Sequence, residues 1–310
     1  MISVIIPCLN EELSIADTIK ELKSSSVYAL EIIVVDNGST DKTFEVASAL
    51  GVEVIREPKQ GKGFAFRRGL SRVSESSEAI FMIDGDSTYS PAKLDLAHKL
   101  IVEMGFDMVV GTRVVSSGND HAYRFGHRTG NRLLTWISKF TFGSEIEDSL
   151  SGWRMFSRGF ALSFLGGASR FELEAELNAH AFHLKAAVCN IDVEYRERLE
   201  GSFSKLDTFR DGLRILKRKI ALWRNERPFR AYSSFAFPWI LVSTTLLIRA
   251  LDSYFTTGLV PKFPSLIVSV GGFIIAVNLW AAGMILERTN LQRVAFARYV
   301  YLQESSRTSN

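Results

Sequence analysis

The chain has 310 residues, which is enough for one large domain or two ordinary ones, and its formal net charge at pH 7 is only +3. Basic residues gather in Arg210–Arg230, directly before a long apolar run, which favours the anionic face of a membrane over nucleic acid as a partner. The chain has only two cysteines, Cys8 and Cys189, in apolar contexts and without metal-type spacing. They argue against a disulfide scaffold and are typical of buried thiols in a reducing compartment. No basic stretch precedes the first apolar run, so we expect no cleaved signal peptide.

Short β-branched runs alternate with amphipathic segments over the first third of the chain. This alternation predicts an α/β fold with a mostly parallel sheet and helices on both faces. The expected strands are Ile2–Pro7, Glu31–Val35, Val52–Ile55, Ala79–Ile83 and Asp107–Val110. The expected helices are Glu12–Ser24, Lys42–Leu50, Phe64–Val73 and Pro91–Glu103.

Two carboxylates close the fourth expected strand, in the sequence Asp84-Gly85-Asp86. The carboxyl ends of strands are where open α/β sheets bind ligands. Oxygen ligands suit Mg²⁺ or Mn²⁺, which also bind phosphate oxygens. We therefore expect Asp84 and Asp86 to hold Mg²⁺ or Mn²⁺ on a diphosphate. Taken alone, such residues more often form a strand-end turn with a helix N-cap.

The alternation loosens after residue 113. Arginines among apolar residues in Tyr123–Phe142 predict a basic amphipathic helix, which either lies on a membrane surface or packs against the sheet. Ser149–Phe156 reads as a turn followed by a strand, and Ala186–Tyr195 as the last strand. Further helices are expected at Glu172–Phe182 and Thr208–Arg224.

Two uncharged apolar segments follow, Tyr232–Ile248 and Pro264–Leu286. The second is long enough to cross a hydrocarbon layer of about 30 Å, and the first is short for a span and could instead be interfacial or buried. The linker Arg249–Lys262 carries few basic residues, whereas both outer flanks carry many. This distribution predicts a transmembrane hairpin in the cell membrane, with both termini cytoplasmic.

Polar side chains follow the expected strands at one edge of the sheet. Acidic, amide and basic groups converge there, where a nucleotide could lie. These residues are Asn10, Glu11, Asp36, Asn37, Lys62, Asp84, Asp86 and Arg113.

Seven motifs in order make this sequence resemble the GT-A glycosyltransferases of family 2, specifically the polyprenyl-phosphate glycosyltransferases typified by dolichol-phosphate mannose synthase. Each motif is weak alone, and their order over residues 1–206 is what is specific. The motifs are Ile5-Ile6-Pro7-Cys8-Leu9-Asn10-Glu11, Val34-Val35-Asp36-Asn37-Gly38-Ser39-Thr40-Asp41, Gly61-Lys62-Gly63, Asp84-Gly85-Asp86, Gly111-Thr112-Arg113, Asp148-Ser149-Leu150-Ser151-Gly152-Trp153-Arg154 and Gly201-Ser202-Phe203-Ser204-Lys205-Leu206.

The resemblance implies roles in donor binding. Asp36 would accept from the base and help select uracil or guanine, unless it only caps a turn. Lys62 would lie near the donor, unless it is a solvated loop lysine. Asp86 would ligate the metal, and Asp84 would touch the ribose or complete the metal shell. The nucleoside site would be lined by Pro7, Asn10 and Glu11.

The resemblance also implies phosphate contacts, because a planar guanidinium binds phosphate through two hydrogen bonds. Arg113 would face the donor diphosphate or the acceptor phosphate. Arg128 would be a second clamp on the acceptor phosphate, or an ordinary surface arginine. Arg198, Ser204 and Lys205 match a loop that lies near the membrane in this family and would bind the acceptor phosphate, or else form a solvated linker.

Asp148 stands where many inverting GT-A enzymes carry a base. A phosphate acceptor needs no base, so Asp148 would either take a proton or orient the sugar or acceptor. Glu174, with Glu172, would contact the sugar or merely complement a helix N-terminus. Two positions depart from the family pattern: Thr88 replaces a frequent Gln of the metal motif, and Asn37 replaces the second carboxylate of Asp-Asp-Gly-Ser.

We therefore expect an inverting transferase, anchored in the membrane, that moves a sugar from UDP or GDP to undecaprenyl or dolichyl phosphate. The alternatives are a glycan or glycolipid hydroxyl as acceptor, or a catalytically silent, membrane-tethered binding or scaffold protein. A homo-oligomer is compatible with this expectation, and nucleic acid is not an expected partner. The expected parts are a GT-A catalytic domain (1–206), a basic juxtamembrane helix (207–230), two transmembrane helices (231–286) and a cytoplasmic tail (287–310).

Overall fold

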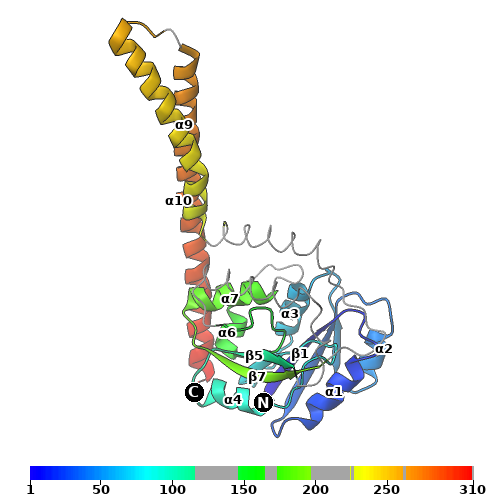
Figure 1. Ribbon diagram of the computed structural model, residues 1–310. Coiled ribbons are helices and arrows are strands. Elements are labelled where there is room, and N and C mark those ends of the chain that lie inside the picture. Colours follow the sequence, from blue (N-terminus) through cyan, green and yellow to red (C-terminus); the bar gives the residue numbers. More distant parts are fainter. Residues whose placement is uncertain (116–145, 165–172, 197–223, 225–226, 261–262, 309–310) are drawn as a thin grey trace. The chain divides into compact units, whose positions relative to one another are not determined.

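The computed structural model describes residues 1–115, 146–164, 173–196, 224, 227–260 and 263–308 (Figure 1). The expected basic helix at Tyr123–Phe142 lies outside these residues, as does nearly all of the one at Thr208–Arg224. The chain divides into two compact units, which are described separately below. One comprises residues 1–207 together with 296–310, and the other comprises residues 208–295.

A seven-stranded sheet forms the centre of the first unit, in the order β3-β2-β1-β4-β6-β5-β7. Within the described part of the chain, β6 runs antiparallel to both of its neighbours, and the other strands point the same way. The mostly parallel sheet that the sequence predicts is therefore confirmed. The strands are β1 (Ile2–Cys8), β2 (Leu30–Asp36), β3 (Glu53–Arg56), β4 (Ala79–Met82), β5 (Met108–Val115), β6 (Arg154–Ser157) and β7 (Val188–Tyr195).

Helices cover both faces of the sheet, because the central strands are apolar on both sides. In β1, for example, Val4 and Ile6 belong to one buried cluster and Ile5 to the other. The first face is covered by α1 (Ile15–Ser24), α2 (Thr43–Ser48) and α4 (Leu94–Val102). The second is covered by α3 (Lys62–Leu70), α6 (Arg158–Leu162) and α7 (Leu173–Leu184).

The last turns of the C-terminal helix also belong to the first unit. The Tyr301 hydroxyl donates to Asp107 Oδ1 at 2.8 Å, and Arg158 Nε lies 3.3 Å from Glu304 Oε2. Gly159 leaves room for this helix, since a Cβ there would lie 3.0 Å from the Tyr301 carbonyl oxygen. The final residues, expected as a cytoplasmic tail, thus pack on the same unit as the sheet.

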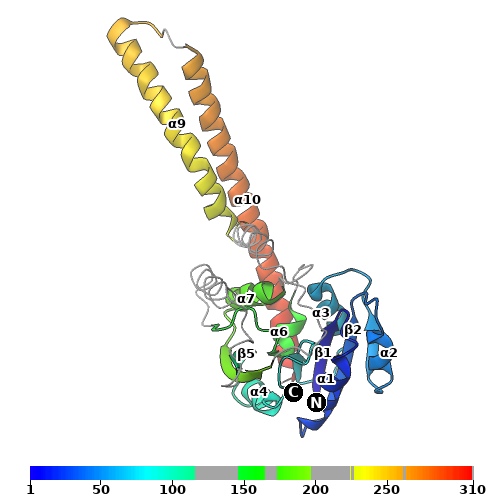
Figure 2. The same ribbon diagram turned by 45° about the vertical axis from the view of Figure 1, so that its right-hand side comes forward.

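The second unit contains most of two long helices, α9 (Pro228–Thr257) and α10 (Phe263–Thr308), which lie side by side in Figure 2. Both are long and apolar enough to cross a membrane, which makes them a candidate membrane hairpin. They pack through small residues: Ser269 Oγ donates to the Ser243 carbonyl at 2.8 Å, and Gly272 lies against the Ser243 side chain.

The helix boundaries differ from the expected ones. The segment expected to end at Ile248 continues to Thr257, because Arg249 and Asp252 are compatible with a helix. Gly258, with a φ of 68°, provides the left-handed cap that ends α9. The expected linker at 249–262 is therefore shorter than the sequence suggested, and α10 continues through the region expected as a tail.

Candidate active site

The expected donor residues meet at the carboxyl ends of β1 and β2, where Cys8 lies beside Asp36 in register. The Asp36 carboxylate is 3% exposed and accepts from the Ser39 backbone N–H at 2.9 Å. Its other oxygen lies 3.6 Å from Arg56 Nε. Asp36 therefore does stabilise its own turn, and that role is compatible with the predicted contact to a base. Pro7, in β1, lies half-buried next to Val35.

The loop after β1 is hydrogen-bonded to the turn after β2. Asn10 has a φ of 53°, and its side-chain oxygen accepts from the Thr40 backbone N–H at 2.7 Å. The Glu11 backbone N–H donates to Thr43 Oγ1 at 2.8 Å, and Ser14 donates to the Glu11 carboxylate at 3.2 Å. The two loops thus form one connected rim, and the roles of Asn10 and Glu11 in donor binding stay predictions.

Lys62 links Asp84 to Glu174. Its ammonium lies 2.5 Å from Asp84 Oδ1 and 2.6 Å from Glu174 Oε1. The Lys62 side chain is 16% exposed, so the alternative of a solvated loop lysine is wrong. Burial alone would lower the pKa of Lys62, but the two carboxylates outweigh it and raise the pKa above its usual value. Glu174, which the sequence left between two readings, is brought into this group.

Asp86 is held in one orientation by Thr88, which donates to its Oδ1 from the hydroxyl at 2.6 Å and from the backbone at 3.2 Å. Asp86 is 6% exposed. Glycines shape the neighbourhood: a Cβ on Gly85 would lie 2.6 Å from Cys8 Sγ, and one on Gly152 would collide with the Asp84 carboxylate. The strand-end turn that the sequence suggested is present, and it carries both Asp84 and Asp86.

The carboxylates of Asp84 and Asp86 fit a divalent cation whose other ligands would come from the substrate and water. Within the described ranges, no group of three or more His, Cys, Asp or Glu side chains could hold a metal ion. Asp84 and Asp86 offer hard carboxylate oxygens, which suit an ion completed by phosphate oxygens and water. The Lys62 ammonium already lies at Asp84 Oδ1, so Asp86 would be the principal protein ligand of such an ion.

Arg113 and Asp148 form a two-pronged ion pair. Arg113 Nε lies 2.6 Å from Asp148 Oδ2, and its Nη2 lies 2.8 Å from Oδ1. The guanidinium also lies over the Tyr195 ring, 5.4 Å from its centre. Burial tends to raise the pKa of Asp148, but the hydrogen bonds and charge of Arg113 outweigh it and lower the pKa below its usual value. Asp148 is therefore an anion at neutral pH.

Arg154 supports the loop that carries Asp148. Its buried guanidinium donates to the Ser149 carbonyl at 3.2 Å, the Ser151 carbonyl at 2.9 Å and Asn178 Oδ1 at 2.6 Å. The sequence placed Arg154 in a motif but gave it no role, because an arginine in a strand gives no sign of its burial. Its motif membership was the available signal.

Tyr89 was also missed. Its hydroxyl accepts from the Gly152 backbone N–H at 3.1 Å, and burial raises the pKa of Tyr89 well above its usual value. It therefore joins the Asp84–Asp86 turn to the Asp148 loop as a neutral hydroxyl.

The expected acceptor-phosphate residues lie outside the described residues: they are Arg128, Arg198, Ser204 and Lys205.

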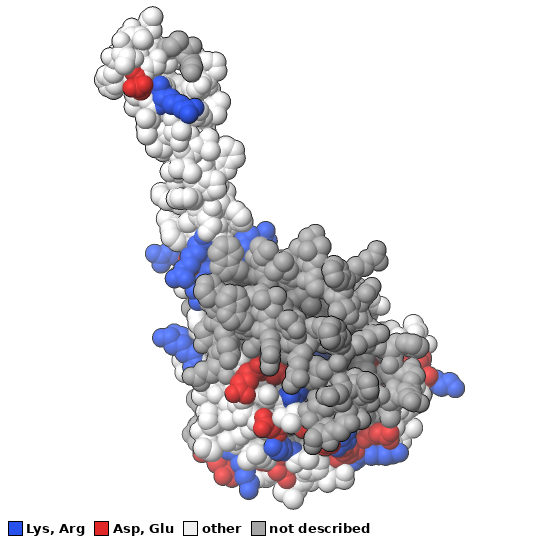
Figure 3. All heavy atoms as spheres, viewed as in Figure 1, with Lys and Arg blue, Asp and Glu red and all other residues white. Residues whose placement is uncertain are grey.

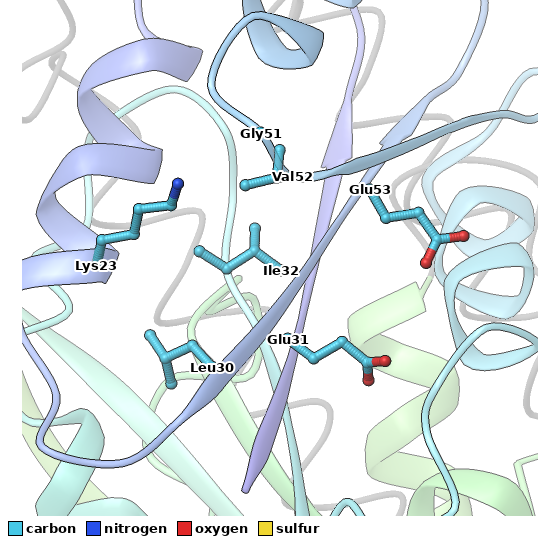
Figure 4. Close-up of a pocket in the computed structure, with 7 residues that line it drawn as sticks. All are labelled: Lys23, Leu30, Glu31, Ile32, Gly51, Val52 and Glu53. Atoms are coloured by element: carbon cyan, nitrogen blue, oxygen red, sulfur yellow. The ribbon is translucent and has the colours of Figure 1, made fainter.

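A surface hollow lies at the amino ends of β2 and β3, not at the strand ends that carry this chemistry (Figure 4). Strands β2 and β3 begin beside it, whereas the candidate site lies where the parallel strands end. Lys23 borders it and donates to the Leu50 carbonyl at 2.8 Å. Its position gives it no part in the site.

Comparison with known proteins adds an independent finding. A sequence model described as glycosyl transferase family 2 matches residues 3–163. The glycosyltransferase AglJ of Haloferax volcanii is 25% identical over 299 residues, covering 94% of this chain and 97% of its own. A dolichyl-phosphate hexose transferase of the same organism is 27% identical over 230 residues, covering 73% of this chain and 95% of its own.

Solved structures agree on the fold. The glucosyl-3-phosphoglycerate synthase of Mycobacterium tuberculosis, in complex with Mn²⁺, UDP and phosphoglyceric acid, superposes with a TM-score of 0.55 at 24% identity. The match covers 71% of this chain and 78% of that one. It confirms the expected sheet architecture.

Proposed function

The chain belongs to glycosyltransferase family 2 and has the GT-A fold, and on that premise we propose that it transfers a sugar from a nucleotide donor to a polyprenyl phosphate. The reaction would proceed with inversion at the anomeric carbon. A phosphate oxygen of the acceptor would form the new bond to that carbon, while the bond to the nucleoside diphosphate breaks and its electron pair leaves with the diphosphate.

The donor side of the proposal rests on the rim at the strand ends. Asp36 would accept from the base N–H, and the loop carrying Pro7, Asn10 and Glu11 would line the nucleoside. Asp86, with Asp84, would hold Mg²⁺ or Mn²⁺, which would neutralise the leaving diphosphate. A solved structure of similar fold with UDP and Mn²⁺ bound supports a nucleoside diphosphate and a divalent cation as the ligands.

The Arg113–Asp148 pair is the observation that carries the acceptor assignment. A general base works best when its pKa lies near the working pH, and Arg113 lowers the pKa of Asp148 instead. Deprotonating a sugar hydroxyl would be hard for such a carboxylate. A phosphate monoester has its second pKa near about 6 and is already an anion, so it needs no base. Asp148 would then orient Arg113 towards a phosphate.

The candidate hairpin supports a lipid acceptor. Its small polar side chains Ser243 and Ser269 are buried, whereas large apolar ones such as Phe237 and Val277 are exposed. That is the reverse of a water-soluble helix pair and suits a lipid environment. Figure 3 shows few charged side chains on the visible face of the hairpin between its ends.

Placement in the cell membrane, with the catalytic domain and both termini cytoplasmic, completes the proposal. A long apolar acceptor stays in the bilayer, so its phosphate would be met at the interface. Arg128, Arg198, Ser204 and Lys205 would bind that phosphate there. The relative named dolichyl-phosphate hexose transferase supports this class of acceptor.

A panel of nucleotide sugars tests the donor assignment. The purified full-length protein in detergent would be melted with UDP-sugars and GDP-sugars, each with and without Mg²⁺ or Mn²⁺. We expect one nucleotide to raise the melting temperature in the presence of metal, since ligand at one hundred times its Kd stabilises by about 2.7 kcal/mol. If neither nucleotide shifts the melting temperature with either metal, the proposal is wrong.

A further inference from the structure

Asn37 occupies the place where the family pattern has a second carboxylate, directly after Asp36. Its side chain is 3% exposed. The amide nitrogen donates to the Glu57 carbonyl at 3.0 Å and to the Lys59 carbonyl at 2.7 Å, and the amide oxygen accepts from the Gly61 backbone N–H at 2.6 Å. Both amide hydrogens are therefore engaged by the 57–61 loop. Asn37 does not present them to a ligand.

The 57–61 loop that Asn37 holds leads directly into α3. Gly61 has a φ of 142°, which favours glycine, and it is the N-cap of the helix. Its carbonyl accepts from the Phe64 and Ala65 backbone N–H groups at 3.0 and 3.1 Å. Its own N–H has Asn37 as its acceptor. Asn37 thus fixes the residue from which α3 begins.

Lys62 is the next residue, and its ammonium contacts both Asp84 and Glu174. A continuous line of contacts therefore runs from the end of β2, through Asn37 and Gly61, to the carboxylate at the end of β4. A shift of Gly61 would move the Lys62 backbone, and the ammonium could keep its short contacts only by changing rotamer.

We propose that Asn37 is a positioning residue of the donor site, which holds Lys62 against Asp84 and leaves Asp36 alone to face the base. The proposal rests on the proposed function, because it presumes a nucleoside diphosphate at this rim. Asn37, which stands where the family pattern has a carboxylate, then has a task that a carboxylate cannot perform. An aspartate has no N–H to donate, and its second oxygen would face two carbonyl oxygens at the distances now spanned by hydrogen bonds.

The nearly isosteric variant Asn37→Asp tests this directly. Titration calorimetry of the full-length protein with UDP and with GDP, each with Mn²⁺, would measure nucleotide affinity. We expect Asn37→Asp to weaken binding at least tenfold, and the donor KM to rise more than kcat falls. Glu57→Gln changes one charge in the same loop and keeps the acceptor for the Lys59 N–H, so it should bind as the wild type does.

A double-mutant cycle separates positioning from general damage. If Asn37 acts through Lys62, Asn37→Asp should cost less than about threefold in affinity when Lys62→Met is already present. An undiminished tenfold loss in that background would overturn the proposal. Wild-type affinity in Asn37→Asp would overturn it as well.

Folding is checked by the melting temperature and circular dichroism. If Asn37→Asp does not fold, Asn37→Ala, which removes the three hydrogen bonds without adding charge, takes its place in the same cycle. If neither variant folds, Asn37 serves the fold alone and the proposal is wrong. If the wild type binds neither UDP nor GDP, the proposed function itself fails, which is a different result from a wild type that binds and a variant that binds equally well.

Discussion

Asp86 and Thr88 behave as one unit at the residue scale. The sequence showed Thr88 at the position where the family's metal motif often has Gln. In the structure, Thr88 donates to Asp86 Oδ1 and so orients the carboxylate. We therefore propose that the metal shell is built on Asp86, donor oxygens and water.

Replacing Asp86 tests the metal assignment. Asp86→Asn keeps the oxygen that accepts from Thr88 and removes the charge, so it should fold and lose turnover by about a thousandfold or more. Asp86→Ala should be equally inactive, with the fold and membrane insertion intact. Thr88→Val, which loses one hydrogen bond to the Asp86 carboxylate, should lower turnover by about tenfold. Transfer assays and Mn²⁺ titration in the presence of nucleotide measure these effects. Turnover above a tenth of wild type in Asp86→Asn would refute the assignment.

The Asp148 carboxylate sets a pH dependence of stability. Its pKa in the folded protein lies below the unfolded value of about 3.9, so its contribution is fully present above that value and is lost as the pH falls through the folded pKa. Between pH 5 and 8, Asp148→Asn should lower the free energy of unfolding by about 3 kcal/mol, because Arg113 is left without its charge partner. The gap in melting temperature between the two proteins should narrow below about pH 4. A gap that is constant down to pH 3 would contradict the pairing.

Sequence reasoning identified the residues of the site better than their partners. Asp84, Asp86, Lys62 and Arg113 could be placed at the strand ends, because strand order and motif spacing determine which loops meet. The Lys62–Glu174 contact could not be foreseen, since it joins residues 112 positions apart through α7. Burial of Arg154 was equally invisible, because the pattern of a strand does not say which of its polar residues faces inward.

At the scale of elements, the positions of the strands were easier to predict than the direction of each strand or the residues at which the helices end. The short apolar run of β6 carries no mark of direction, so its antiparallel place between β4 and β5 needed the structure. Residues 287–310 were expected as a tail because they follow the second uncharged apolar segment. They are helical and pack on the first unit through Tyr301 and Glu304.

The Tyr301–Asp107 hydrogen bond tests that packing. Burial, together with the hydrogen bond to Asp107, raises the pKa of Tyr301 to about 12, so the hydroxyl stays a donor at any working pH. Tyr301→Phe removes the donor and should cost about 1 kcal/mol, or roughly 2–4 °C in melting temperature. Tyr299→Phe is the matched control, since Tyr299 is 63% exposed on the same helix and should have no effect. Equal melting temperatures for all three proteins would show that the contact does not stabilise the fold.

At the scale of the whole molecule, the chain combines an α/β transferase unit with a pair of helices that expose apolar side chains. In the proposed reaction, the first unit would bind the nucleotide-sugar donor, and the helix pair would suit an acceptor that cannot leave a bilayer. Composition predicted both halves, because apolar length and strand–helix alternation are properties of the sequence itself. The nature of the acceptor depends on groups that the sequence pattern does not fix.

Transfer to a lipid phosphate is the most direct test of the central claim. The full-length protein would be reconstituted in liposomes containing a polyprenyl phosphate and given the labelled nucleotide sugar that stabilises it, with Mn²⁺. A parallel reaction would offer a glycolipid bearing free hydroxyl groups and no polyprenyl phosphate. We predict that label enters the polyprenyl-phosphate lipid alone, in a linkage released by mild acid. Label on the glycolipid hydroxyl, with none on polyprenyl phosphate, would contradict the account.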